Sequence, residues 1–291
     1  MNRLLKLYTL SALLFYCNVS FSLAQNSGPS ISTPSSGTAK KAPVNRRLSP
    51  TTRPVNPYQK IKYPWHLHVT VSVFWVGEKP TARNPTPNHA SSWDVNWQAN
   101  FGGYDNPDPA ARAGYIPKAF VPKQNPFYIA LPYNDCINHA LHKPEAKRVI
   151  PWFSRVNPRP GKTTCKGRWI KIVRNEKVCY AQWEDCGPFF TDDYQYVFQN
   201  KKVKNTQNKS AGLDISPAVR DYMGIKSGDK VHWSFIDFKD VPKSGPWAKY
   251  GTNNPFLDPK QDPDYEAKVR YSNYLKSLRG QSSNGGSYGR F

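Results

Sequence analysis

The segment "AGLDISPAVRDYMGIKSGDKVHWSF", residues 211–235, constrains the fold more than any other part of the chain. Ser216 is a favourable helix N-cap, and Pro217 suits the first helical position, where its missing N–H would have no partner. Gly224 can end the helix because it adopts positive φ without strain. "KVHWSF" alternates and is rich in strand formers, which predicts a returning strand. Asp214 therefore lies where a strand leads into a short helix.

A lone carboxylate at such a junction has two interpretations. Asp214 is either a turn or capping residue, as short polar side chains often are, or a functional acid held by regular structure on both sides. Two other segments also have a strand end followed by a polar turn with a carboxylate. They are "ALPYND", which contains Asp135, and "WEDCGPF", which contains Asp185. Glycan cleavage needs an acid, and hydrolysis usually needs a second carboxylate. These three aspartates are therefore the candidate catalytic residues.

The first 24 residues have the form of a secretory signal peptide. Basic Arg3 and Lys6 precede an apolar stretch, and Ser22-Leu23-Ala24 resembles a small-x-small cleavage site. The apolar stretch is too short to be a good membrane span. We therefore expect a secreted or periplasmic protein.

Composition divides the remaining chain into three parts. Residues 25–60 are rich in Ser, Thr and Pro, with basic residues and no acidic one, and are predicted to form a disordered linker. Residues 61–240 carry strand-like segments and are long enough for one domain with a single core. Residues 241–291 lose this alternation, which predicts an irregular or flexible tail.

The chain is strongly basic, with a formal net charge of +21. Removing residues 1–24 takes away two basic residues and no acidic residue, which leaves +19. This charge favours anionic partners such as acidic glycans, membrane surfaces or nucleic acid. Export and the lack of zinc-finger and RNA-binding signatures argue against nucleic acid. We expect the basic linker to contact anionic surfaces, and we expect a monomer.

The cysteine pattern predicts disulfides. Four cysteines follow the signal peptide: Cys136, Cys165, Cys179 and Cys186. An even number in an exported chain predicts two disulfides, and the alternative, a four-cysteine zinc site, lacks any paired C-x-x-C. Residues 165–186 resemble a β-hairpin. If Asn175 and Glu176 form its turn, Cys165 lies opposite Cys186 and Cys136 is left for Cys179, although a slip of one residue would change the pairing.

Three motifs carry a resemblance to a known family. "VCYAQWEDCGPF", then "AGLDISPAVRDYMGI", then "GDKVHWSF" is similar to the double-psi β-barrel of rare lipoprotein A, whose pattern runs N-D-R-G-P-F, then I-D-L-S-x-A-A, then a final strand. The same stretch resembles the barrel of expansins and related endoglucanases, which have H-F-D-L in place of "GLDI". The resemblance covers residues 127–238.

The resemblance implies a mainly β fold, a six-stranded double-psi β-barrel with one or two short helices and long loops. It implies a glycan-binding groove in which Asp214 matches the catalytic aspartate and Asp185 matches the aspartate of the D-R-G-P motif. Cys186 replaces the arginine of that motif, and Gly212-Leu213 replace His-Phe. The histidine of peptidoglycan-cleaving members has no clear match, and Asp135 is a candidate to substitute for it.

Aromatic residues near the motifs are candidates for stacking on sugar rings. They are Tyr133, Trp152, Trp169 and Trp183. The alternative is that they fill the barrel core. His66 and His68, and likewise His139 and His142, are spaced to share one face, but nothing in the sequence brings the two pairs together. We expect core or solvated histidines there, no metal and no cofactor.

Three functions are compatible with these patterns. The first is a secreted enzyme, lytic transglycosylase-like or hydrolase-like, that cleaves peptidoglycan or a related polysaccharide with Asp214 as general acid. The second is a non-catalytic, expansin-like protein that binds or loosens cell-wall polysaccharide. The third is an inhibitor or structural protein that has lost the site. The intact Asp214 argues against the third, and the missing histidine argues against the first in its usual form. The sequence narrowly favours the first.

Overall fold

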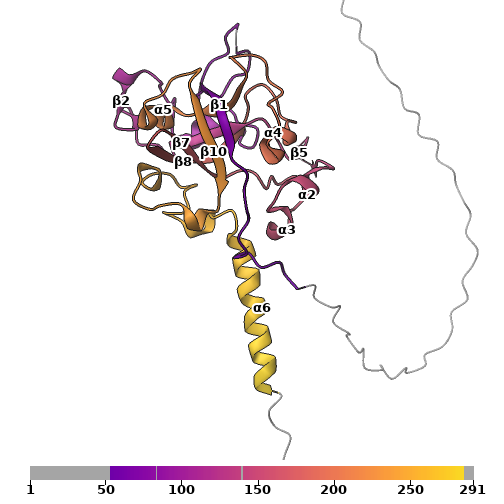
Figure 1. Cartoon of the computed structure of the whole chain (residues 1–291). Helices are drawn as coiled ribbons and strands as arrows, with labels where there is room; N and C mark the ends of the chain where they lie inside the picture. Colours follow the sequence, from indigo (N-terminus) through magenta and orange to yellow (C-terminus); the bar gives the residue numbers. More distant parts are fainter. Residues whose placement is uncertain (1–52, 83, 139, 285–291) are drawn as a thin grey trace, which may run out of the picture. The chain divides into compact units, whose positions relative to one another are not determined.

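Six strands of the chain close into one mixed β-barrel (Figure 1). The computed structural model describes residues 53–82, 84–138 and 140–284. In order around the barrel, the strands are β1 (His66–Val73), β10 (Lys230–Ile236), β7 (Trp169–Arg174), β8 (Lys177–Cys186), β4 (Tyr128–Leu131) and β9 (Ala211–Ile215). The closed six-stranded barrel predicted from the sequence is confirmed.

The strand register positions the candidate catalytic residues. The β1–β9 and β4–β8 pairs are parallel, and the other four pairs are antiparallel. In the β1–β9 pair, Ser72 lies opposite Asp214. Ala130 of β4 lies opposite Asp214 on one side and opposite Asp185 on the other. Asp185, Ala130 and Asp214 therefore form one row across three adjacent strands.

The segment 211–235 folds as its sequence predicts. After β9, the Ser216 side chain accepts a hydrogen bond of 3.2 Å from the Val219 N–H and caps α5 (Pro217–Met223). Gly224 ends the helix in the left-handed region at φ 67°. The chain then returns as β10. Because both helix ends are specified by local residues, this unit could be read without knowledge of the rest of the fold.

The hairpin prediction is confirmed, but the disulfide prediction is not. β7 and β8 pair with Arg174 opposite Lys177, so Asn175 and Glu176 form the turn. The ladder begins at Trp169, however, so Cys165 lies outside it. Cys136, Cys165, Cys179 and Cys186 are all free thiols in this structure, and neither predicted disulfide is formed. Three of them are buried, as is common for a cysteine that packs as a small apolar side chain.

The connections between barrel strands contain more helix than the one or two short helices predicted. The α-helices of the described residues are α1 (Trp97–Phe101), α2 (Ala146–Val149), α3 (Phe153–Val156), α4 (Tyr194–Gln199), α5 and α6 (Tyr265–Asn284). Two small sheets pair β2 (Arg112–Ala113) with β3 (Ile116–Pro117) and β5 (Cys136–Ile137) with β6 (Leu141–His142). Four 3₁₀ turns span Pro109–Ala111, Phe238–Asp240, Pro246–Ala248 and Pro259–Gln261.

The segment between β10 and α6 is irregular in backbone, as expected for the tail, but it packs against the barrel through buried residues. Trp247 is 4 % exposed and its ring lies 4.9 Å from that of Tyr180. Asn254 is fully buried and donates to the carbonyl of Trp247 at 2.8 Å. These buried anchors are widely spaced along an irregular backbone, so the part of the tail before α6 has no strand-like or helix-like period for sequence analysis to detect.

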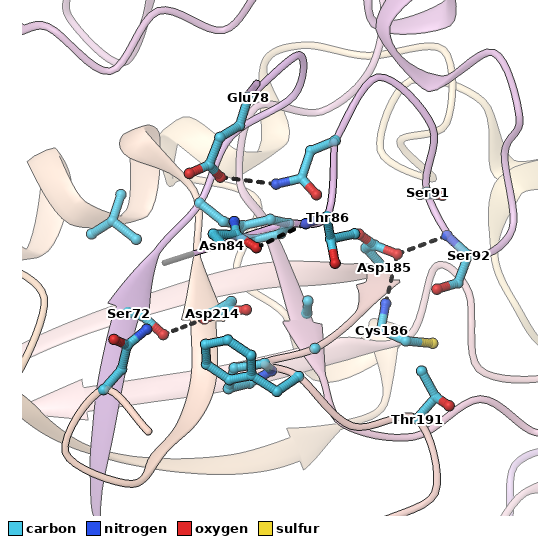
Figure 2. A pocket seen from close by; sticks show the side chains of 18 of the residues that line it. Ser72, Glu78, Asn84, Thr86, Ser91, Ser92, Asp185, Cys186, Thr191 and Asp214 are labelled. Atoms are coloured by element: carbon cyan, nitrogen blue, oxygen red, sulfur yellow. Dashed lines mark hydrogen bonds between the residues drawn. The ribbon is translucent and has the colours of Figure 1, made fainter. Parts of the chain in front are cut away.

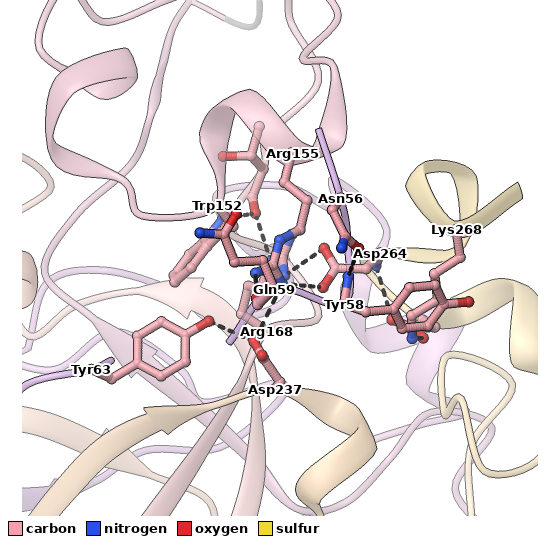
Figure 3. A network of polar contacts seen from close by, with 12 residues as sticks. Asn56, Tyr58, Gln59, Tyr63, Trp152, Arg155, Arg168, Asp237, Asp264 and Lys268 are labelled. Atoms are coloured by element: carbon pink, nitrogen blue, oxygen red, sulfur yellow. Dashed lines mark hydrogen bonds and ion pairs between the residues drawn. The ribbon is translucent and has the colours of Figure 1, made fainter. Parts of the chain in front are cut away.

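A buried ionic network joins both ends of the described chain to the barrel domain (Figure 3). Asp264, just before α6, receives Arg155 at 3.2 Å and Arg168 at 3.0 Å, one on each carboxylate oxygen. Arg155 also donates to the carbonyl of Gln59 at 2.6 Å. The hydroxyl of Tyr63 donates to Asp237 at 2.6 Å. The predicted linker and the predicted tail therefore each contribute ordered residues to one folded unit.

Candidate functional site

A cleft of about 410 Å³ lies where the row of Asp185 and Asp214 reaches the surface of the barrel (Figure 2). Three carboxylates line it, namely Asp185, Asp214 and Glu78. Most of the other polar residues that line it are neutral: Ser72, Asn84, Thr86, Asn88, Ser91, Ser92, Thr191 and Asn208. Two of the three predicted catalytic aspartates are thus brought together by the fold.

Asp214 is half-buried at the end of β9. The hydroxyl of Ser72 on the neighbouring strand donates a hydrogen bond to its carboxylate. Burial, opposed by the Ser72 hydrogen bond and assisted by the charges of Asp185 and Glu78, raises the pKa of Asp214 to about 7. Desolvation disfavours the charged form of a carboxyl, so Asp214 holds its proton up to neutral pH.

Gly187 leaves the space that Asp214 occupies. A Cβ atom at residue 187 would lie 3.0 Å from Asp214 Oδ2, which is closer than nearly all real Cβ contacts. Gly187 of "WEDCGPF" therefore contributes to the cleft because it has no side chain that would displace the Asp214 carboxyl group. The two motifs of the family resemblance meet at this point.

Asp185 is held by backbone donors. The N–H groups of Ser92 and Cys186 each donate to its Oδ1 at 2.7 Å. Burial raises the pKa of Asp185 to about 6, and these hydrogen bonds to the charged form limit the rise. Trp183 donates from its indole to the carbonyl of Asp185 at 2.7 Å, so a buried core residue also fixes the position of this acid.

Sequence analysis missed the third acid, Glu78. It lies two residues after the strand-like run 66–76, next to Gly77, and so has the same form of strand end, turn and carboxylate as the three aspartates. Burial raises the pKa of Glu78, while hydrogen bonds from Asn84 and Asn88 oppose the rise. The Asn88 amide donates to Glu78 Oε2 at 2.9 Å. The pattern that selected the other candidates could have found this residue.

Asp135 does not belong to the cleft, which corrects its prediction as a catalytic residue. It is fully buried and accepts hydrogen bonds from the Thr163 hydroxyl at 2.5 Å and the Thr164 N–H at 2.7 Å. Such contacts tie the "ALPYND" turn to the segment before β7. Asp135 therefore stabilises a turn and does not line the cleft of Asp185 and Asp214.

Asp135 also belongs to a group that could hold a metal ion. Its carboxylate, the Cys136 thiol and the His142 ring offer ligand atoms within 4.8 Å of one another. Thr163 and Thr164 together donate three hydrogen bonds to the Asp135 carboxylate, which occupy most of its roughly four lone-pair sites. We therefore assign no metal to this group. Of the other predicted histidine pairs, His66 is buried and stacks on Trp233 at 3.9 Å, His68 lies beside His232, and His139 is outside the described residues.

The four aromatic residues predicted to bind sugar are core residues, which corrects that prediction. Tyr133, Trp152, Trp169 and Trp183 are each at most 1 % exposed. Trp152 packs edge-on against Phe235, and Trp183 lies 5.8 Å from the same ring. None of the four can present a face to a ligand. Large apolar side chains fill the interior of the barrel, and these four aromatic residues serve that purpose.

The departure from the family motif at Gly212 has a steric cause. A Cβ atom at residue 212 would lie 2.6 Å from the hydroxyl of Tyr196, which is buried beneath β9. The same hydroxyl accepts a hydrogen bond of 3.0 Å from the Trp233 indole. The histidine that expansins carry at this place does not fit here, because Tyr196 occupies its space.

Comparison with protein-family models, with curated proteins and with solved structures found no match to the chain. The fold and the cleft therefore define a class, a closed six-stranded β-barrel with a carboxylate-lined cleft at the ends of β8 and β9. Among residues 53–82, 84–138 and 140–284, no helix has both the length and the apolar character needed to cross a membrane.

Proposed function

We propose that this protein is a secreted enzyme that cleaves a cell-wall polysaccharide, with Asp214 as the general acid. The observation that carries the proposal is geometric: Asp214 and Asp185 lie on either side of Ala130 and line one cleft with Glu78, and burial there raises the pKa of Asp214 to about 7. A general acid works best when its pKa lies near the operating pH. Asp214 is protonated in a large fraction of molecules at neutral pH, whereas an ordinary aspartate is not.

Asp185 is suited to be the second carboxylate. Its pKa of about 6 lies below the value of about 7 for Asp214, so the pair favours a protonated Asp214 together with an ionised Asp185. Environments that push two carboxyl pKa values apart support separate acid and base roles. In hydrolysis, Asp214 protonates the leaving glycosidic oxygen as its bond to the anomeric carbon breaks. Asp185 takes a proton from the water that attacks that carbon.

The lining of the cleft supports a hydroxyl-rich substrate. Asn, Ser and Thr side chains surround the acids, and these can both donate to and accept from sugar hydroxyls. The resemblance of the "WEDCGPF" and "AGLDIS" motifs to rare lipoprotein A favours peptidoglycan. The net charge of +19 after the predicted signal peptide suits an anionic wall.

Product analysis tests the proposal. Purified peptidoglycan and β-glucans are incubated with the wild type and with Asp214→Asn, and soluble fragments are identified by mass spectrometry. Reducing ends support hydrolysis, and anhydro ends support transglycosylation, in which a hydroxyl of the sugar replaces water. Binding without any product supports the expansin-like alternative, in which the same cleft only binds polysaccharide. If the wild type releases no product and does not bind either polysaccharide, both functions are refuted.

A further inference from the structure

A second pocket, separate from the acid cleft, lies beside the end of β8. It has a volume of about 370 Å³ and its walls include Trp93, Lys162, Lys166, Glu184 and Asn253. Glu184 directly precedes Asp185 of the acid cleft, and Trp93 directly follows Ser92. Ser92 and Asp185 thus line the acid cleft, while their chain neighbours Trp93 and Glu184 line the second pocket.

A β-bulge produces this division on β8. Ile129 and Ala130 are consecutive on β4, but they pair with Trp183 and Asp185. Glu184 is therefore the extra residue of the bulge. A bulge re-aims side chains and is common beside functional sites. Here it directs two neighbouring carboxyl groups into different pockets.

The second pocket contains buried polar atoms without partners. Glu184 is 2 % exposed, and its Oε2 atom has no hydrogen-bond partner among the described residues. Lys166 Nζ is 3.9 Å away, which is too far for a hydrogen bond. The amide nitrogen of Asn253 likewise makes no hydrogen bond of ordinary geometry within the described part of the chain, although it lies near enough to Glu184 to oppose the rise in the pKa of that carboxyl. Buried polar groups are almost always satisfied, so one open acceptor and one open donor on the same wall require an explanation.

The charges around these atoms select the chemistry of a ligand. Lys166 Nζ lies 3.9 Å from Glu184 Oε2 and offsets its charge, and Lys162 is exposed to solvent, so the wall of the pocket has little net charge to attract an ion. A neutral hydroxyl group both donates to Glu184 and accepts from Asn253, so it satisfies both open atoms at once. Trp93 is half-buried and lines the same pocket, and aromatic side chains favour contact with the apolar faces of ring-shaped ligands.

We propose that this pocket is a second sugar-binding subsite, in which Glu184 and Asn253 bind the hydroxyls of one sugar unit and Trp93 packs against its ring. The ligand class rests on the proposed function, because a polysaccharide long enough to pass the acid cleft also offers units to the neighbouring pocket. Glu184 and Trp93 have no part in bond cleavage. They hold the chain, so their loss weakens binding rather than chemistry.

The test measures binding and cleavage separately on the full chain. The probes are chitohexaose, cellohexaose and a peptidoglycan tetrasaccharide, and affinity is measured by titration calorimetry. Glu184→Gln and Trp93→Ala are compared with Glu176→Gln, at an exposed hairpin turn, and Trp65→Ala, at an exposed tryptophan outside both pockets. Melting temperatures establish that each variant is folded. We expect the two pocket variants to weaken binding roughly tenfold, and the two controls to leave it unchanged.

The outcomes separate this inference from the proposed function. If the wild type releases fragments and folded pocket variants bind as well as the wild type, the subsite is refuted while the enzyme remains. If the pocket variants bind more weakly but no probe is cleaved, the subsite stands and catalysis is refuted. If the wild type neither binds nor cleaves any probe, both are refuted.

Discussion

Asp185 and Asp214 are placed opposite the same residue, Ala130, from its two sides. Because neighbouring strands lie about 4.8 Å apart, the backbones of the two acids are separated by roughly 10 Å, with the small side chain of Ala130 between them. A larger residue at 130 would stand between the two carboxyl groups in the cleft that all three residues line. The barrel register thus sets both the spacing of the acids and the opening between them.

The first prediction concerns the acid itself. Asp214→Asn keeps the shape of the side chain and an oxygen that accepts from Ser72, but it cannot deliver a proton. General acid–base groups contribute about 10²- to 10⁴-fold, so we expect kcat to fall by at least the lower end of that range. The matched control is Asp192→Asn, at a surface aspartate paired with Lys204, which should keep full activity. Full activity in folded Asp214→Asn would remove this residue from the mechanism.

The second prediction is a bell-shaped dependence of activity on pH. Asp185 must be ionised to act as a base, so activity should rise as pH passes its pKa of about 6. Asp214 must be protonated to act as an acid, so activity should fall as pH passes about 7. Because the charge of each acid affects the other, the two apparent pKa values of the pH profile describe the pair of acids together. Rates of fragment release between pH 4 and 9 measure both limbs, and a flat profile across this range would contradict the assignment.

The third prediction is that ionised Asp214 destabilises the fold at neutral pH. The pKa of Asp214 is raised, so between about pH 4, its ordinary value, and about pH 7 the unfolded chain binds fewer protons than the folded one. Stability therefore falls as pH rises through this window. Asp214→Asn removes this loss and should be more stable than the wild type above pH 7, by on the order of 4 kcal/mol, with little difference below pH 4. Urea unfolding at pH 4 and pH 8 measures the two values.

The fourth prediction concerns the space beside Asp214. In Gly187→Ala, the added methyl group would meet Asp214 Oδ2 at 3.0 Å, so the carboxyl must move. Small displacements of a reacting group can reduce rates by up to about 10²-fold, and we expect a loss of at least tenfold in kcat with a preserved barrel. A circular dichroism spectrum and melting curve check the fold. Wild-type kcat would show that the carboxyl position tolerates the change.

Local signals predicted local structure, and tertiary contacts decided the rest. The caps Ser216 and Gly224 lie next to the helix they delimit, so α5 was readable from sequence. The meeting of Asp185 and Asp214 depends on both strands pairing with β4, which no short segment encodes. Asp135 has the same strand-end pattern, yet its carboxylate accepts hydrogen bonds from Thr163 and Thr164 inside the protein. Whether a strand-end acid faces a cleft or a turn depends on residues far away in sequence.

The fifth prediction tests the anchor of the C-terminal segment. Asp264 lies between Arg155 and Arg168, all three at least nine-tenths buried. Burial opposes its ionisation, but the charges of Arg168 and Arg155 prevail and lower the pKa of Asp264. Asp264→Ala leaves two buried guanidinium groups without their shared carboxylate. Breaking a buried pair in this way costs about 3–5 kcal/mol.

The pH dependence of that loss identifies its cause. A lowered pKa contributes stability above the ordinary value of about 4, and this contribution disappears as pH falls through the lower value in the folded state. The difference between Asp264→Ala and the wild type should therefore be largest near pH 7 and shrink in acid. Glu266→Gln is the matched control, because its partner Arg159 is 57 % exposed and exposed ion pairs contribute at most about 1 kcal/mol. Equal losses in both variants, measured by urea unfolding, would mean that the buried network does not hold the segment.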